Sequence, residues 1–513
     1  MKDKYLALLA MIFACVILTS LALSTESAKT LKVASMWDIP DLDPIQRGDA
    51  WAEKSLVTET LVSSNQNFEI LPQLAVSWNR IDDQTWEIRL RDDVKFHDGS
   101  MMTADDVKFT LERGIEADAT IARLIDLDHI EVVDATTLKI HTKNPNSVLP
   151  AALHDPSLGI ISRNSMDKDG KFIKPIGTGP YELESFDNQT HVLTVKKNNN
   201  WWKGAAKIDK IITTPMTDSN TRALAIENGD VDFTVDIPYS EVDRINSISG
   251  LSAEKYKTSY LYRLDLNINH EPLNNIDFRH ALSYGIDRDQ IAEYVLFGVG
   301  SNDSVPFDSS MPWANNSVKH YDYDEKTARE LLQKSGWTDS DGDGMLDRDG
   351  KPLELSLLTY ATRPGLVPVS EAIAGDFKKL GIKVNLEVLE WGAIESRRKD
   401  GDWDMVLFAT NCALIPDPYY YLQRSYGTGG TYNYVSYSNP TVDDLLAESM
   451  SASDVQARYD ILKDVQSITQ DEAMNIIVAH YGMVVARKDG VTGFVFDPAA
   501  HDYILNSEMD ISG

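Results

Sequence analysis

The stretch Trp86–Arg113, WEIRLRDDVKFHDGSMMTADDVKFTLER, carries three structural signals in succession. Apolar and polar residues alternate over Thr85–Leu90, which predicts a strand with one buried face. Asp98-Gly99 predicts a tight turn, because glycine tolerates a positive φ. Thr103 is a good N-cap, because its side chain can accept a hydrogen bond from a free backbone N–H. We therefore expect a strand, a turn and a helix here.

Strands and helices alternate on both sides of this stretch, which predicts a mixed α/β protein. Asp322 with Glu325 predicts a capping box at the start of one helix, and Gly336 follows the end of that helix. The expected strands are 30–36, 137–141, 192–196 and 208–213, and the expected helices are Trp51–Val62, 219–228, 277–285, 323–335, 370–380 and 455–471.

The N-terminus differs from the rest of the chain. Lys2 and Lys4 precede an apolar run from Leu6 to Leu23, the pattern of a secretory signal. Residues 1–24 are either cleaved before Thr25 or kept as a membrane anchor, and a lipid on Cys15 is a third alternative. Each alternative places the remainder outside the cytoplasm, in the periplasm or at the cell surface.

Composition narrows the function classes. The 513 residues suggest about three domain-sized units. A net charge of −30 argues against a nucleic-acid partner, since phosphates would be repelled. After cleavage only Cys412 remains, so no intrachain disulfide can form, and we expect Cys412 to be a buried small residue. The mature chain is expected to be soluble and monomeric.

Several segments resemble the family 5 extracytoplasmic solute-binding proteins of ABC importers, which include oligopeptide, dipeptide and nickel receptors. The resemblance begins with Trp86–Arg113 and recurs from end to end of the mature chain. The other matching segments are Pro175–Tyr181 (PIGTGPY), Phe278–Ile291 (FRHALSYGIDRDQI), Tyr321–Leu353 and, in outline, Gly401–Leu422.

This resemblance implies a two-lobed periplasmic-binding-protein-like fold (type II, cluster C) with an inserted domain and a cleft between the lobes. It implies lobe I from 30–69, 176–266 and 482–513, an inserted domain at 70–175, and lobe II at 267–481. It also implies ligand capture by hinge closure and delivery to an ABC permease and its ATPase, as in peptide or nickel transport. A ligand-presenting sensor remains an alternative. We find neither a Gly-x-Ser-x-Gly nor a His-Glu-x-x-His motif, and we expect no enzymatic activity and no required cofactor.

The ligand is less defined by sequence. In peptide-binding members an aspartate shortly before an Asp-Pro pairs with the ligand ammonium, but here Cys412, Ala413 and Leu414 precede Asp417-Pro418. An ammonium there would lack a counter-ion, so we expect an anionic ligand or a chelated metal. Peptide transport stays open, because most of the motifs are shared with peptide binders. The candidate ligand contacts are Trp51, Arg123, His154, Trp391, Cys412, Ala413, Leu414 and Tyr419.

One loop has calcium-ligand spacing. Asp339, Asp341, Asp343 and Gly342-Gly344 fit the first half of a calcium loop, with Asp347 at its ninth position. The twelfth position is Gly350, where a bidentate acid belongs. The loop is therefore either a structural calcium site or a polar hairpin.

Overall fold

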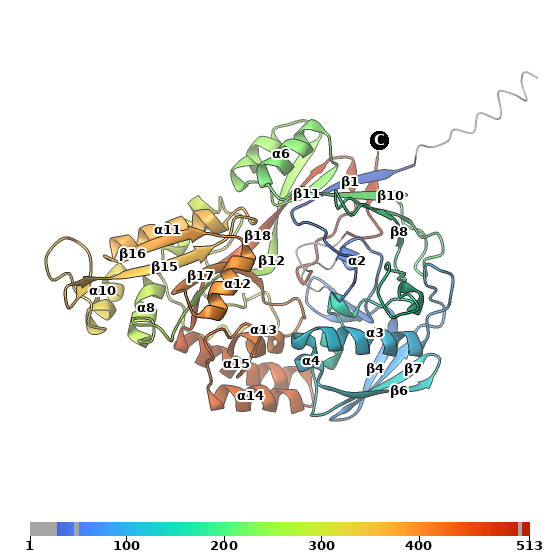
Figure 1. Cartoon of the computed structure of the whole chain (residues 1–513), viewed down its shortest axis with the longest axis horizontal. Coiled ribbons are helices and arrows are strands. Elements are labelled where there is room, and N and C mark those ends of the chain that lie inside the picture. The colour runs from blue at the N-terminus through green and yellow to red at the C-terminus, as the bar shows by residue number, and fades with distance from the viewer. Residues whose placement is uncertain (1–27, 46–50, 501–504, 513) are drawn as a thin grey trace, which may run out of the picture.

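The computed structural model describes residues 28–45, 51–500 and 505–512. Residues 1–24, which carry the predicted leader and Cys15, lie outside the described residues. The core is a ten-stranded mixed sheet (Figure 1). In spatial order its strands are β16 (Lys383–Val388), β15 (Glu354–Thr359), β17 (Met405–Asn411), β12 (Leu251–Leu266), β18 (Asn475–Lys488), β11 (Phe233–Val235), β1 (Thr30–Ser35), β10 (Lys210–Pro215), β9 (Leu193–Lys197) and β8 (Tyr181–Phe186).

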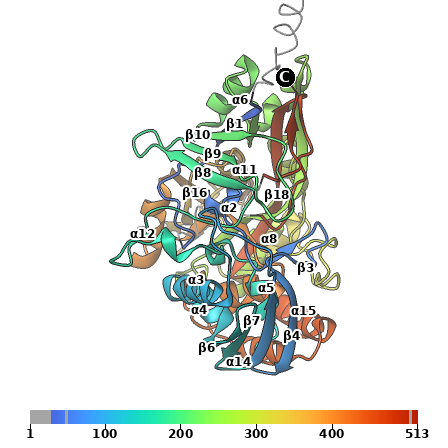
Figure 2. The ribbon, with the colours of Figure 1, turned by 90° about the vertical axis from the view of Figure 1, so that its right-hand side faces the viewer.

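Two long antiparallel strands, β12 and β18, join the two halves of this sheet (Figures 1 and 2). Leu251–Lys257 pairs with Gly482–Lys488, and Leu261–Asp265 pairs with Asn475–His480. The register shifts between these two blocks. We call the half with β11, β1, β10, β9 and β8 lobe I, and the half with β17, β15 and β16 lobe II. The register shift marks the hinge between them.

Side-chain hydrogen bonds hold the backbone at this hinge. Thr258 Oγ1 donates to the carbonyl of Tyr481 at 2.7 Å. Ser259 Oγ lies 2.6 Å from both Asn411 Oδ1 and the carbonyl of Pro498. One residue therefore contacts the end of a lobe II strand and the C-terminal segment that returns to lobe I.

A separate antiparallel sheet follows the first strands of lobe I, in the order β4 (Ala75–Asp82), β5 (Thr85–Leu90), β7 (Thr137–Thr142) and β6 (Leu127–Asp134). The helices α3 (Ala104–Ala117) and α4 (Ala119–Ile125) lie beside it (Figure 1). The predicted strand 85–90, the turn with Gly99 at φ 86° and the Thr103 N-cap are all confirmed. Asp106 accepts hydrogen bonds from both Thr103 N and Thr103 Oγ1, at 3.0 and 2.7 Å.

The larger helices lie mainly in lobe II. The cap of α10 is Asp324, whose side chain accepts from Thr327 N, so the predicted cap at Asp322 is wrong by one half-turn. The two short β-strands of the hairpin after α10 are β13 (Asp347–Arg348) and β14 (Lys351–Pro352). The main helices are α6 (Ser219–Asn228), α8 (Ile276–Tyr284), α10 (Glu325–Lys334), α11 (Leu366–Lys379), α12 (Trp391–Asp400), α13 (Pro418–Tyr426), α14 (Pro440–Ser451) and α15 (Val455–Glu472).

The predicted helix Trp51–Val62 is wrong beyond its first turn. The helix α2 covers only Trp51–Lys54, and Leu56 has a φ of 59°. The carbonyls of Leu56 and Val57 accept hydrogen bonds from Tyr181 and Gly179 instead of from a following helical turn. The apolar spacing in this segment therefore reports burial against another segment.

The segment 175–181 explains its own glycines. A Cβ on Gly177 would lie 2.0 Å from the carbonyl oxygen of Val57, and one on Gly179 would lie 2.1 Å from that of Leu56. Neither glycine has a positive φ among those that the structure describes. The glycines are thus required by close backbone approach, and the sharp bend expected from the sequence is not their reason.

Contacts away from the hinge join the four-stranded sheet to lobe II. Arg458 Nη1 on α15 donates to the carbonyl of Ser147 at 2.8 Å. Arg80 Nη1 on β4 donates to the carbonyl of Ala452 at 2.7 Å. Figure 1 shows α4 next to the α13–α15 helices. The two lobes are therefore held together on both sides of the space between them.

Candidate functional site

A cavity of about 180 Å³ lies where lobe I, the segment after α5 (Leu149–Ala152) and the loop after β17 meet. We call it the Leu414 cavity. Most of its wall comes from lobe I and the C-terminal segment, and Leu414 contributes the wall from lobe II. Its ionisable lining residues are Glu53, Glu59, His154, Lys203 and Asp497.

His154 connects the two sides of this cavity. Its Nδ1 lies 3.2 Å from the carbonyl oxygen of Leu414, and its Nε2 lies 3.1 Å from Ser64 Oγ. A carbonyl only accepts, so Nδ1 carries the proton, and Nε2 accepts from the Ser64 hydroxyl. Burial lowers the pKa of His154, although Asp497 and Asp155 oppose this. The ring is therefore neutral near pH 7.

Glu53 was not predicted from the sequence. It lies on α2, two residues after Trp51, and lines the cavity. Burial and the neighbouring carboxylates of Asp155 and Asp497 raise the pKa of Glu53 to about 8, and Lys54 only partly opposes them. An acid in this state is stabilised by any cation that approaches it.

Asp497 faces Glu53 from the C-terminal segment after β19 (Val491–Thr492). Its Oδ1 accepts a hydrogen bond from Ala499 N at 2.9 Å. Burial raises the pKa of Asp497, while His154 counteracts the rise. Glu53 and Asp497 thus bring two destabilised carboxylates from opposite ends of the sequence to one cavity.

Glu59 is the contrasting acid of the cavity, because its carboxylate is surrounded by donors. It accepts from Thr178 Oγ1 at 2.8 Å, from Trp202 Nε1 at 3.1 Å and from Trp201 Nε1 at 3.3 Å. Burial still raises its pKa, and Lys203 acts against that rise. Glu59 therefore has its partners inside the protein and fastens the segment 175–181 to lobe I.

The loop before Asp417 lies in the protein interior. Cys412 and Ala413 are fully buried, which confirms the burial expected for Cys412, and the Cys412 thiol contacts the carbonyl of Pro306 at 3.3 Å. Leu414 reaches the cavity. The expectation that an ammonium beside Leu414 would lack a counter-ion is wrong, because Glu53 and Asp497 line the same cavity.

The other candidate contacts lie outside the lining of this cavity. Trp51 is buried and donates from Nε1 to the carbonyl of Asp38 at 3.0 Å. Arg123 is exposed and donates to the carbonyl of Thr428 at 3.1 Å. Tyr419 is buried on α13, and Trp391 packs edge-on against Tyr360 with ring centroids 5.3 Å apart. Of the ligand contacts expected from the sequence, the structure brings His154 and Leu414 together.

The family of the chain follows from comparison with known proteins. Residues 69–433 match the family model described as bacterial extracellular solute-binding proteins, family 5 middle. The chain belongs to this family. The prediction from the sequence motifs is thereby confirmed, and the chain is a solute-binding protein of the ABC-importer type.

Curated relatives and solved structures extend over nearly the whole chain. The nickel-binding protein NikA of Staphylococcus aureus is 26% identical over 86% of both chains. The glutathione-binding protein GsiB of Salmonella paratyphi A is 28% identical over 92% of this chain and 93% of its own. The crystal structure of S. aureus NikA with Ni(L-His)2 superposes with a TM-score of 0.82 at 24% identity, covering 94% of this chain and 100% of that one.

A peptide-bound structure is similar to about the same degree. Helicobacter pylori DppA in complex with the peptide STSA has a TM-score of 0.79 at 24% identity, and the match covers 96% of this chain and 100% of that one. The two-lobed periplasmic-binding-protein fold expected from the sequence is confirmed by these neighbours. Within the described part of the chain, no helix is long and apolar enough to cross a membrane.

In this family 5 protein, Arg363 joins the lobes near the hinge. It extends from the loop between β15 and α11 and is 3% exposed. Its guanidinium lies 4.4 Å from the ring centroid of Tyr260 on β12, 5.1 Å from that of Tyr481 on β18 and 5.5 Å from that of Trp37 in lobe I. Lobe II is therefore closed onto lobe I, with aromatic faces around one cation.

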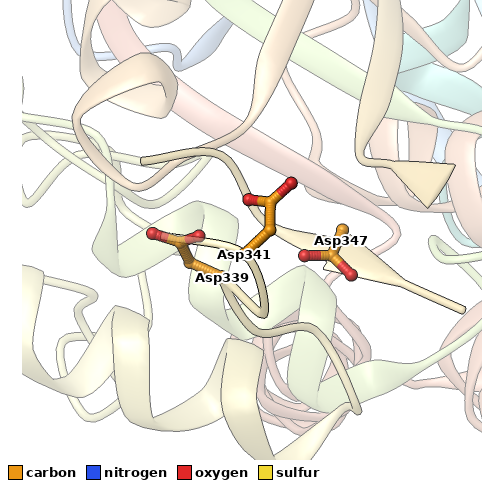
Figure 3. Close-up of side chains that lie close together, drawn as sticks. All are labelled: Asp339, Asp341 and Asp347. Atoms are coloured by element: carbon orange, nitrogen blue, oxygen red, sulfur yellow. The ribbon is translucent and has the colours of Figure 1, made fainter. Parts of the chain in front are cut away.

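The acidic loop, residues 339–347, lies far along lobe II from this site. Carboxylate oxygens of Asp339, Asp341 and Asp347 lie within 4.8 Å of one another (Figure 3). Asp343 is not part of this group, and its Oδ1 accepts from Met345 N at 2.8 Å. Three carboxylates suit a hard cation such as Ca²⁺.

The same carboxylates already accept hydrogen bonds from their own loop. Asp339 accepts from Gly342 N at 2.7 Å and from Gly344 N at 3.0 Å. Ser340 donates to Asp347 through both its backbone N and its hydroxyl, which lowers the pKa of Asp347. The geometry therefore fits both readings of the sequence, a calcium site and a polar hairpin.

Proposed function

We propose that this chain captures a small polar ligand in the Leu414 cavity outside the cytoplasm and delivers it, as a monomer, to an ABC permease and its ATPase. The observation that carries this proposal is the composition of the cavity wall. Glu53 and Asp497 come from the lobe I side, and Leu414 comes from lobe II. A ligand that touches both sides stabilises the closed arrangement, which is the form that a permease would recognise.

Three ligand classes deserve first testing, because relatives over most of this chain bind them. They are nickel–histidine complexes, glutathione and short peptides. Capture and release of such ligands needs no bond chemistry, so the proposal includes no enzymatic activity. It also includes the domain division given above, with β12 and β18 crossing between the lobes, and a structural calcium ion in the acidic loop.

The test is binding followed by a measurement of shape. The mature chain is titrated calorimetrically with Ni(II)–histidine, reduced glutathione and the peptide Ser-Thr-Ser-Ala. We expect one class to saturate at one ligand per chain, to lower the radius of gyration in solution scattering and to raise the melting temperature. An unchanged radius at saturation would contradict hinge closure, and absence of binding by all three classes would contradict the proposed ligand range.

A further inference from the structure

We infer that the Leu414 cavity is a cation subsite, in which the carboxylates of Glu53 and Asp497 pair with a positively charged nitrogen group of the ligand, an ammonium or a guanidinium. This inference rests on the proposed function and names the part of the ligand that enters the cavity. It places the anchoring acids on the lobe I side, whereas the loop before Asp417 carries none.

The charges around the cavity do not balance. The carboxylates of Glu53, Glu59, Asp155 and Asp497 act on it, against the ammonium groups of Lys54 and Lys203. Lys203 acts on Glu59, and Lys54 acts on Glu53. His154 is neutral because burial lowers its pKa. Negative groups therefore remain in excess beside Glu53 and Asp497, and a ligand cation would offset them.

An unpartnered buried hydroxyl points to the same ligand. Thr58 lines the cavity and is 3% exposed, yet its Oγ1 has no hydrogen-bond partner among the described residues. A buried hydroxyl without a partner costs about 1–3 kcal/mol, so proteins rarely leave one unless a ligand or water completes it. Thr58 Oγ1 can accept from an N–H of the ligand cation.

The carboxylate of Glu53 is similarly available. Within the described chain, no hydrogen bond to this carboxylate contributes to its ionisation. An ammonium presents three N–H donors and a guanidinium presents five, which matches the acceptors offered by Glu53, Asp497 and Thr58. A cation in the cavity would therefore satisfy charge and hydrogen bonding together.

Two other occupants fit the cavity less well. Among the described residues, the only group of three or more acids, cysteines or histidines that could hold a metal is in the acidic loop, so the cavity lacks a ligand set for a bare metal ion. Both ring nitrogens of His154 are also engaged, with Leu414 and Ser64. An anion would face Glu53 and Asp497 directly, and Lys203 already acts on Glu59.

The test compares ligands that differ only at the amine. The intact chain is titrated at pH 8 with Ser-Thr-Ser-Ala and with reduced glutathione, each with a free amino group and in N-acetylated form, and with Ni(II)–histidine. We expect a free-amine probe to bind and its acetylated form to bind at least tenfold more weakly. This comparison uses the unmutated chain, so it does not depend on the folding of any variant.

Three variants then locate the effect. Glu53→Gln and Asp497→Asn should each weaken binding of the free-amine probe tenfold or more and leave the residual binding of the acetylated form unchanged. Glu69→Gln is the matched control, because Glu69 is an exposed acid outside the cavity lining and should change neither.

The outcomes separate this inference from the proposed function. Equal binding of free and acetylated probes, or unchanged binding by both cavity variants, would overturn the cation subsite and leave a binding protein with a different anchor. Binding of Ni(II)–histidine alone, unaffected by Glu53→Gln, would also overturn it. Failure of every probe would overturn the proposed ligand range as well.

Discussion

The Leu414 cavity and the acidic loop are both rich in carboxylates, but their acids are stabilised in opposite ways. In the loop, Asp339 and Asp347 are exposed or half-exposed and accept hydrogen bonds from backbone and hydroxyl groups nearby in sequence. In the cavity, Glu53 and Asp497 are held among other carboxylates and apolar surface. The pKa of Asp347 is accordingly lowered, and that of Glu53 is raised to about 8.

This contrast separates an acidic cluster that is complete without a ligand from one that is not. A carboxylate that is solvated and bonded to its own loop gains little from a cation. A carboxylate that is buried without enough donors is stabilised substantially by one. The number of acids in a region is therefore a weaker guide to binding than the partners that each acid already has.

The largest expected effect is on the pH dependence of stability. The pKa of Glu53 is raised from 4.5 to about 8 in the folded chain, so the folded state holds a proton that the unfolded state has lost between these values. Stability should therefore fall as pH rises from 5 to 8, by up to about 1.4 kcal/mol per pH unit. Asp155, Asp497, Lys54 and His154 face this region and set the size of the effect.

Glu53→Gln should flatten this decline by up to about 3 kcal/mol over the interval, as measured by urea unfolding from pH 5 to pH 8. Asp347→Asn is the control from the acidic loop. The folded pKa of Asp347 is lowered, so its contribution is present above its unfolded pKa and is lost only as pH falls below that value. A slope in the parent chain that Glu53→Gln leaves unchanged would show that Glu53 is not destabilised in the folded state.

A smaller effect is expected from calcium. Extracellular calcium sites commonly bind with dissociation constants near 1 mM, so 10 mM calcium should stabilise the chain by about 1.4 kcal/mol. Asp341→Asn should abolish this gain in a thermal melt. Asp343→Asn should retain it, because Asp343 is outside the carboxylate group. Identical melts with calcium and with chelator would identify the loop as a hairpin without a cation.

The smallest effect compares two threonine hydroxyls near the cavity. Thr178 Oγ1 donates to Glu59 at 2.8 Å, whereas Thr58 Oγ1 has no partner among the described residues. Thr178→Val should destabilise the chain by about 1–2 kcal/mol in urea unfolding. Thr58→Val should be neutral or stabilising by up to about 1 kcal/mol, yet it should weaken binding of the free-amine probe. Equal loss of stability in both variants would show that the Thr58 hydroxyl is satisfied in the empty protein.

Local signals in the sequence predicted much of the fold. The strand 85–90 and the helix 219–228 match the structure in their bounds, because alternation, Asp218 as an N-cap and Gly229 as a C-cap all act within a few residues. The helix beginning at Trp51 failed after one turn for a non-local reason. Its carbonyls at Leu56 and Val57 are taken by the segment 179–181, which no property of residues 51–62 reveals.

The site shows the same limit more strongly. His154 and Leu414 were found because the resemblance pointed to their positions, and the structure places both in one cavity. Glu53 and Asp497 have no local motif, and a chain with 79 acidic residues offers no compositional signal for two of them. Their significance comes from burial and from each other, and both are properties of the folded chain.

The long strand β18 also has a consequence for the order in which the protein acquires its parts. Glu53 is made early, whereas β18 and Asp497 follow more than 400 positions later. At about 5–20 residues per second, a nascent chain spends tens of seconds with the first carboxylate in place and the second not yet made. The central pairing of β12 with β18 must also wait for that segment. The pocket is thus assembled last, and a partly synthesised chain cannot compete for ligand with the finished protein.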